Sequence, residues 1–443
     1  MVRFFSIFII ISAASSFLLQ LIMNSKLGAV FPYIFMIIGF LLVKRSKYSD
    51  LPGEKATLAV GVIFLYAWLI IIKIVINYYH IGSLHTSAAD VFNYLLPIMV
   101  YFYYLRISRW DNETSLLIGL VISGIYASIF FVYDSLYRIL NNEVPEFARM
   151  AFQYSMDMMG RAADEMNPVR IAPTARAMGI MTSHSMSATW ISFGAFAAFT
   201  LLKGKYFNTI FLVTASLLLI GLNYTGIVAF LAVTFLCYSE NTFGRIHNKI
   251  HLRKSVFKRK LYLMAFIVAA LLLVSLRFKT VSDRIFTSVT TQTKFILDEG
   301  PQVEHSYLDL IGKNIILFIK IRSTEIAQFA IGNIPSANSN WLVGGDIGFL
   351  DSISLLGFPF WFLLISIFAW VFIKWYLNKG DLLSSINNTD SIDRKRFLIS
   401  VILFLLIMDL HYSVWMNKSI QIVLFASLGF GLAKWDRGSQ HAL

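Results

Sequence analysis

The chain consists largely of long apolar stretches separated by short polar segments, and the length of these stretches predicts transmembrane helices. A bilayer core of about 30 Å is crossed by about 20 apolar residues in a helix, and about twelve stretches of the sequence fit that requirement. Their approximate positions are 4–23, 27–43, 56–79, 91–106, 115–134, 183–202, 206–221, 224–239, 261–276, 350–374, 397–413 and 418–433. The predicted fold is therefore an all-α polytopic membrane protein, with a single transmembrane domain over 1–443.

The distribution of basic residues predicts the orientation of these helices. Lysine and arginine gather in alternate short connections, and such connections face the cytoplasm in membrane proteins. This rule places both termini in the cytoplasm, together with the dense basic cluster at 245–260. It leaves two long segments outside, 135–182 and 277–349, each with an apolar periodicity that predicts short helices. The topology accounts for the cluster at 245–260, so no nucleic-acid partner is expected.

Composition narrows the class of protein further. Hydrophobic residues make up 57% of the 443 residues, charged residues 14%, and the net charge is +13. Soluble domains carry about 25% charged residues, so a soluble enzyme, a coiled coil and a disordered chain are all excluded. The one cysteine excludes a disulfide framework. The sequence has no ATP-binding loop motif and no spacing typical of metal ligands, so neither an ATP-driven motor nor a metal site is expected.

The two outside segments are unusual in their arginines. The first contains Arg138, Arg149, Arg161, Arg170 and Arg176 but no lysine, and the second contains Arg277, Arg284 and Arg322. A planar guanidinium matches phosphate oxygens and stays charged near a membrane. We therefore expect an anionic, phosphate-bearing ligand at the outer leaflet. Ordinary solvated charge, balanced by nearby acidic residues, is the alternative for any single arginine.

Three segments resemble motifs of one known family. Asp346–Gly357 fits the family's pattern at a helix that re-enters the membrane, Arg322–Asn333 fits an arginine followed by an amphipathic helix and a glycine turn, and Arg176–Gly179 followed by Thr182–His184 fits the start of a span. The chain thus resembles the O-antigen polymerase and ligase superfamily of bacterial polysaccharide assembly, which has the C-type glycosyltransferase fold. Ligases of the family place histidine where this chain has Asp346, which favours the polymerase branch. An arginine that relatives carry near Leu222–Gly226 is missing.

The resemblance implies an activity at the outer face of the bacterial inner membrane. A growing glycan would leave undecaprenyl pyrophosphate and join the non-reducing end of a new lipid-linked repeat unit, with no cofactor. The implied partners are the lipid-linked oligosaccharide, membrane lipid and a chain-length regulator protein. An O-antigen ligase acting on lipid A-core and a flippase or transporter of lipid-linked oligosaccharides are the alternatives.

Site residues follow from the resemblance and from the chemistry that it implies. The pyrophosphate would be bound by arginines, namely Arg170, Arg176, Arg284 and Arg322. His305 is the preferred base because an unperturbed imidazole titrates near pH 6.5. Asp346 is the alternative base, or simply the N-cap of the helix that follows it. Tyr307 and Trp341 are expected to stack on sugar rings, and His184 either contacts substrate or lies in a helix interface.

Overall fold

The computed structural model consists of helices joined by short turns and connections over the residues that it describes. It describes residues 2–23, 30–42, 71, 98–107, 114–158, 177–181, 183–202, 206–221, 223–238, 349, 352–353, 358–377, 389–410 and 414–432, and none of these lies in a β-strand. The all-α prediction is confirmed for these residues. By the contacts between its Cα atoms, the chain divides into two compact units, Met1–Leu120 with Ile311–Leu443, and Val121–Leu310.

Each apolar segment that was expected to span the membrane, and that falls among the described residues, coincides with helix. The first unit contains α1 (Val2–Ala14), α2 (Ser16–Met23), α3 (Phe31–Leu42), a helix at Ile98–Ile107, α17 (Phe358–Leu377), α19 (Thr389–Asp409), the short 3-10 helix η5 (Val414–Met416) and α20 (Lys418–Leu432). The second contains most of α6 (Ser115–Asn141), with α7 (Glu146–Met158), α9 (His184–Leu201), α10 (Phe207–Ile220) and α11 (Tyr224–Tyr238). The spans expected at 56–79, apart from residue 71, and at 261–276 lie outside the described residues.

Two predicted boundaries are wrong, and in both cases charged residues belong to a helix. The helix expected to end at residue 134 continues to Asn141, so the first residues of the segment 135–182 are helical. The helix expected from residue 397 begins at Thr389 and includes Arg394, Lys395 and Arg396, which are buried. Arg394 lies 5.0 Å from the centre of the Phe430 ring on α20. Such contacts let a helix continue through residues that composition alone assigns to a connection.

Helix α6 has the properties of a membrane-spanning helix. Among the described residues it alone is both long and apolar enough to cross a bilayer, judged by length and composition. Its exposed large side chains are apolar and recur every three or four residues, which places them in one stripe along the helix. They are Ile122, Ile125, Ile129, Tyr133, Leu136 and Leu140. The buried side of the same helix carries polar residues, among them Asp134, Ser135 and Arg138. Apolar residues outside and charges inside suit a lipid environment.

Close packing in the first unit joins residues far apart in the sequence. Tyr103, in the helix Ile98–Ile107, lies edge-on to Phe40 of α3, and its hydroxyl is 3.0 Å from Ser6 Oγ of α1. A Cβ added at Gly429 of α20 would meet the carbonyl oxygen of Tyr101 at 2.4 Å. The helices α1, α3 and α20 and the segment 98–107 therefore form one packed group, and α19 packs on α20.

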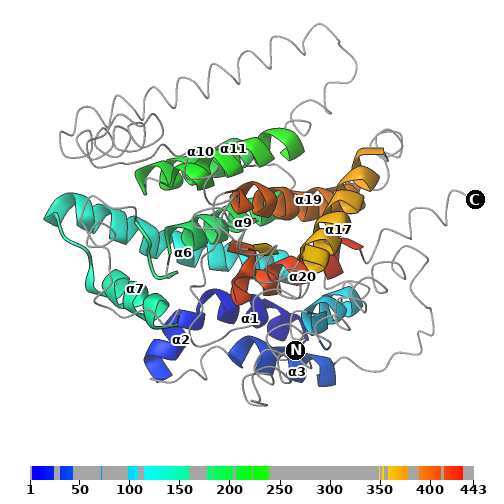
Figure 1. Cartoon of the computed structure of the whole chain (residues 1–443), viewed down its shortest axis with the longest axis horizontal. Helices are drawn as coiled ribbons and strands as arrows, with labels where there is room; N and C mark the ends of the chain where they lie inside the picture. Colours follow the sequence, from blue (N-terminus) through cyan, green and yellow to red (C-terminus); the bar gives the residue numbers. More distant parts are fainter. Residues whose placement is uncertain are drawn as a thin grey trace, which may run out of the picture. The chain divides into compact units, whose positions relative to one another are not determined.

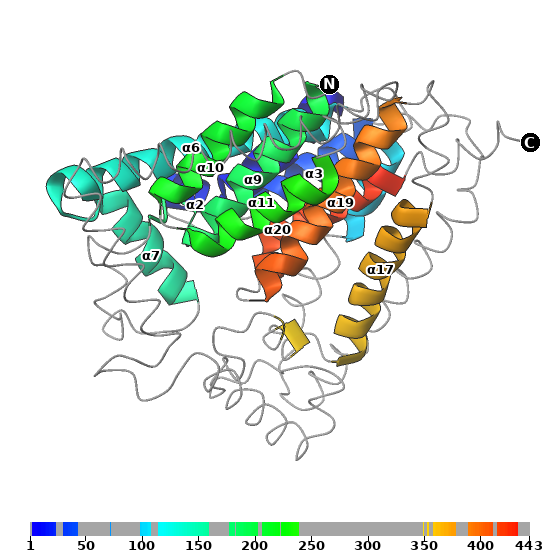
Figure 2. The same cartoon turned by 90° about the horizontal axis from the view of Figure 1, so that it is seen from above.

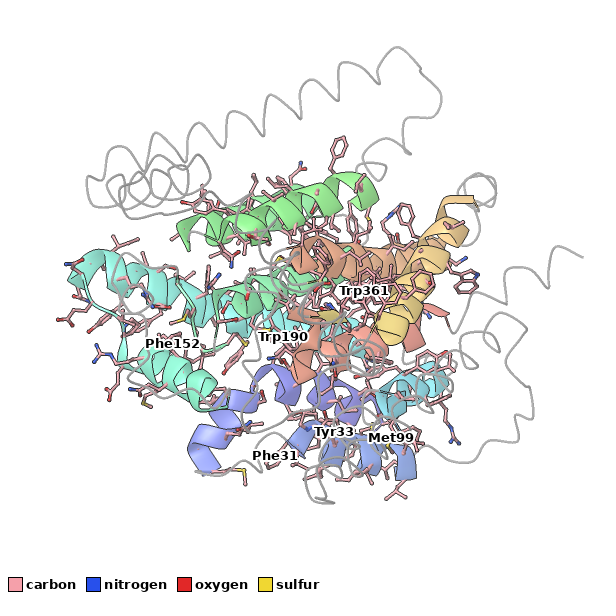
Figure 3. The ribbon with its side chains drawn as sticks, in the orientation of Figure 1. Phe31, Tyr33, Met99, Phe152, Trp190 and Trp361 are labelled. Carbon is pink, nitrogen blue, oxygen red and sulfur yellow. The ribbon has the colours of Figure 1, made fainter. Side chains whose placement is uncertain are left out.

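In the second unit, α9, α10 and α11 lie alongside one another (Figures 1 and 2). Asn223, just before α11, donates to the carbonyl of His184 at the start of α9, while Phe196 and Tyr238 stack further along the same two helices. The helices α9 and α11 therefore run in the same direction. Trp190 of α9, labelled in Figure 3, is fully buried.

Glycine allows α6 to approach α9 closely. A Cβ added at Gly124 would lie 2.7 Å from Gly194 Cα and 3.2 Å from the Trp190 carbonyl oxygen. Ten residues further along α6, Asp134 contacts the segment just before α9 begins. The two helices therefore run antiparallel, and the C-terminal part of α6 lies at the end of the unit where α9 and α11 begin.

Candidate functional site

A buried ion pair lies at that end of the second unit. Arg138 Nε donates to Asp134 Oδ1 at 2.6 Å, one turn apart on α6, and both side chains are fully excluded from solvent. A buried charge is costly unless it is paired and its remaining hydrogen-bonding capacity is used. The second carboxylate oxygen of Asp134 has such partners, because two backbone amides donate to it.

These two amides belong to the segment that resembles the family motif. Met178 N and Gly179 N donate to Asp134 Oδ2 at 2.7 and 2.9 Å, across 44 and 45 residues of sequence. Ser187 Oγ, in the first turn of α9, donates to the Met178 carbonyl. The carboxylate thus fixes the turn at 177–179 on α6, and the Ser187 hydroxyl fixes it on α9. This turn directly follows Arg176 in the sequence.

The backbone of the turn has the conformation that glycine favours. Gly179 has φ +59°, and a Cβ there would meet the backbone N of Phe131 at 3.2 Å. Ala177 N donates to the carbonyl oxygen of Gly221 at 3.3 Å, which joins the turn to the end of α10. Residues 177–181 are buried throughout. The segment is therefore a defined structural element and not a loosely solvated connection.

Asn223 ties together the beginnings of α9 and α11. Its Nδ2 donates to the His184 carbonyl oxygen at 2.6 Å, and its Oδ1 accepts from Gly226 N at 2.8 Å as a helix cap. Ser183 caps α9 in the same way by accepting from Met186 N. Two parallel helices thus begin side by side beside the turn, and the N-terminal ends of helices carry partial positive charge.

The turn gives a direct stability prediction. Gly179→Ala should destabilise the protein by about 1–2 kcal/mol, because a residue with a Cβ is strained at positive φ. The contact with Phe131 adds to this cost. Asn142 offers the matched control, since it also has positive φ, at 53°, where it follows the end of α6. Asn142→Gly should leave thermal unfolding unchanged or raise its midpoint slightly. Equal midpoints for Gly179→Ala and wild type would contradict the strained turn.

A second polar cluster lies in the first unit. Asp409, the last residue of α19, is buried, and its Oδ1 accepts from Ser352 Oγ at 2.9 Å and from Trp415 Nε1 at 2.8 Å. The hydrogen bond from Ser352 connects Asp409 with the segment Asp346–Gly357, which resembles the family motif at a membrane-entering helix.

Of the residues predicted to form the site, one falls among those that the structure describes. His184 is half-buried and is the first residue of α9, and its carbonyl oxygen accepts from Asn223. The other candidates lie outside the described residues, namely Arg170, Arg176, Arg284, His305, Tyr307, Arg322, Trp341 and Asp346. Within the described ranges, no three histidine, cysteine or acidic side chains come together in a way that could hold a metal ion.

The sequence reading missed the pair of Asp134 and Arg138. It placed Arg138 in the outside segment 135–182, among arginines expected to meet either an anionic ligand or solvent, whereas the residue is buried in a helix. Their spacing of four residues was the available signal, since residues at i and i+4 meet on one face of a helix. The partner amides at 178 and 179 left no such signal, because contacts across 44 residues have no local pattern.

No protein-family model matches the chain, and no curated protein matches it. The resemblance to the polymerase and ligase superfamily therefore rests on the motifs themselves. The structure adds information on the surroundings of one of these motifs. The segment 177–179, one part of those motifs, is buried and anchored by charged and polar side chains.

Proposed function

We propose that the protein is a polymerase of undecaprenyl-pyrophosphate-linked oligosaccharide repeat units, a membrane glycosyltransferase that acts at the periplasmic face of the bacterial inner membrane. The observation that carries this proposal is the anchored turn that follows Arg176. A solvated arginine in a long loop needs no buried carboxylate to hold the neighbouring backbone. An arginine that must meet a phosphate in a fixed orientation benefits from a neighbouring backbone that is held in place. Such preorganised charge stabilises a leaving group without reorganisation during the reaction.

The surroundings of the turn favour an anionic ligand. The parallel helices α9 and α11 both begin there, and the partial positive charge of their N-terminal ends attracts anions. The ion pair of Asp134 and Arg138 has no net charge, so its carboxylate does not repel a nearby pyrophosphate. The apolar outer stripe of α6 supports a location in the membrane, where a polyprenyl chain is soluble.

The proposed reaction needs few groups from the protein. The anomeric carbon–oxygen bond to undecaprenyl pyrophosphate breaks, and a bond forms from that carbon to a hydroxyl of the acceptor sugar. Arginines would stabilise the pyrophosphate as it leaves, and a base, His305 or Asp346, would accept the hydroxyl proton. The pyrophosphate is itself the activated leaving group, so the reaction calls for no nucleotide, redox cofactor or metal.

A deletion strain tests this function. Cells without the protein should attach single repeat units to lipid A-core, which a lipopolysaccharide gel resolves as one band in place of a ladder. Loss of all polysaccharide from lipid A-core would identify a ligase instead, and loss of repeat units from the periplasm a flippase. Purified protein supplied with lipid-linked repeat units should also extend chains in the presence of EDTA. A strict requirement for a divalent metal would contradict the proposed chemistry.

A further inference from the structure

Two consecutive helices of the second unit expose side chains of opposite character. Between residues 122 and 129 of α6, every exposed side chain is an isoleucine, namely Ile122, Ile125 and Ile129. Between residues 146 and 153 of α7, every exposed side chain is polar, namely Glu146, Arg149 and Gln153. Isoleucine suits hydrocarbon, whereas an exposed charge is costly there. The change from one face to the other therefore marks a boundary between two environments.

Aromatic rings lie at this boundary. Phe147, in the first turn of α7, lies 5.6 Å from both Phe130 and Tyr133 of α6, measured between ring centres. Tyr126 and Tyr137 extend the group along α6, at 5.1 Å from Phe130 and 5.9 Å from Tyr133. We call these five residues the aromatic cluster. The contacts of Phe147 bring the start of α7 beside α6 about two to three turns before α6 ends.

The length of α6 agrees with a bilayer boundary at the aromatic cluster. From Ser115, where the helix begins, to Tyr133 it rises about 27 Å, which is close to the thickness of about 30 Å of the hydrocarbon core. The helix then continues to Asn141, beyond that thickness. Tyrosine is enriched at the level where hydrocarbon meets the headgroups. Helix length, ring positions and the change in exposed side chains thus indicate the same level.

We infer that the aromatic cluster lies at the outer boundary of the hydrocarbon core and that α7 lies in the headgroup region beyond it. The partner of this surface is the phospholipid bilayer. Acyl chains would cover the exposed isoleucines of α6, while headgroups and water would surround the polar face of α7. Asp134 directly follows Tyr133, so the turn at 177–179 that it holds lies at the same level. The inference requires a membrane location but does not depend on the polymerase reaction.

A second copy of the chain is the other partner that suits exposed isoleucines. Such a partner would cover the apolar stripe of α6, but it would give no reason for polar residues to begin at one level along the helix. A bilayer gives that reason, because its hydrocarbon ends at a fixed distance from the start of α6. The observations therefore favour lipid.

Spin labels at single cysteines test the inference. The chain's own Cys237 is buried and is replaced by alanine in the full-length protein. Ile125→Cys, Ile129→Cys, Arg149→Cys and Gln153→Cys are then made one at a time and labelled with a nitroxide in phospholipid nanodiscs. Collisions of each label with oxygen, which partitions into hydrocarbon, are compared with collisions with a water-soluble nickel chelate. The labels at 125 and 129 should favour oxygen severalfold, and those at 149 and 153 should favour the chelate severalfold.

Leu140 supplies the matched control. It belongs to the same exposed apolar stripe of α6 as Ile129 and is more exposed, at 79% against 61%, but it lies about two turns beyond Tyr133. If apolar character alone decided the surroundings, a label at Leu140→Cys would favour oxygen as the label at Ile129→Cys does. The inference predicts that it favours the chelate, because residue 140 lies outside the hydrocarbon.

Three results would overturn the inference. Preference for the chelate at 125 and 129 would mean that the stripe faces water. Preference for oxygen at 140, 149 or 153 would place the boundary beyond the aromatic cluster. Exclusion of both reagents at 125 and 129, with spin–spin broadening that disappears on dilution with unlabelled protein, would identify a second copy as the partner. If Cys237→Ala lowers the yield of folded protein, the wild-type background serves instead, because the buried thiol is shielded from the label.

Discussion

Replacing Arg284 and Arg322 together by alanine should lower the rate of glycan transfer about a hundredfold to ten-thousandfold. Both are predicted from the sequence as pyrophosphate contacts. A hydrogen bond to a charged group contributes about 1.5–3 kcal/mol, which corresponds to about a tenfold to hundredfold loss for each arginine. The losses multiply if the two contacts act independently. The measurement is the initial rate of chain extension by purified protein, with expression checked on the same preparation.

Lysine at the same positions should restore only part of this rate. A lysine keeps the charge but lacks the planar pair of donors that engages two phosphate oxygens. Arg149 offers a matched control, because it belongs to the same predicted outside segment as Arg170 and Arg176 but is an exposed residue of α7. Arg149→Ala should leave the rate unchanged. A normal rate in the variant lacking both Arg284 and Arg322 would refute the pyrophosphate clamp.

His305→Gln should lower the rate about a hundredfold to ten-thousandfold if His305 is the base, since that is the usual contribution of a general base. Glutamine keeps hydrogen-bonding groups near the imidazole position but accepts no proton at neutral pH. The wild-type rate should also fall at acidic pH, because a protonated imidazole cannot accept a further proton. The His305→Gln variant should lack this dependence.

Asp346→Asn is the companion experiment. Asparagine is as good an N-cap as aspartate, so the variant should fold and lose only the charge. With His305 as the base, we expect Asp346→Asn to keep most of its activity. An inactive Asp346→Asn beside an active His305→Gln would assign the base to Asp346. Activity in both variants would mean that neither side chain removes the proton and that water accepts it late in the reaction.

The helices could be predicted because each requires only a local pattern. An apolar run of sufficient length becomes a helix wherever the structure describes it, and the break at Asn223 separates α10 from α11 as the sequence indicated. The end of α6 could not be predicted in this way. The predicted helix ended at residue 134 because charged residues were taken as a sign of a loop. In the structure, Asp134 and Arg138 neutralise each other inside the helix.

The candidate site was less predictable than the fold. The motif at 176–179 was recognisable, but its anchoring was not, because Asp134 and Met178 are separated by 44 residues. The same holds for the hydrogen bond between Ser352 and Asp409, which joins residues 57 positions apart in the sequence. Polar contacts between distant segments depend on how helices pack, and hydrophobic periodicity carries no information about them.

The spacing of Asp134 and Arg138 has a consequence for how α6 enters the membrane. An unpaired aspartate or arginine near the centre of a helix opposes insertion by about 2.5–3.5 kcal/mol on the scale set by the translocon. These two charges are one turn apart on a single helix, so they can pair as soon as that turn forms during synthesis. A helix of this length and composition that crosses a bilayer would therefore carry the two charges as a neutral pair, whether or not the amides of Met178 and Gly179 are in place.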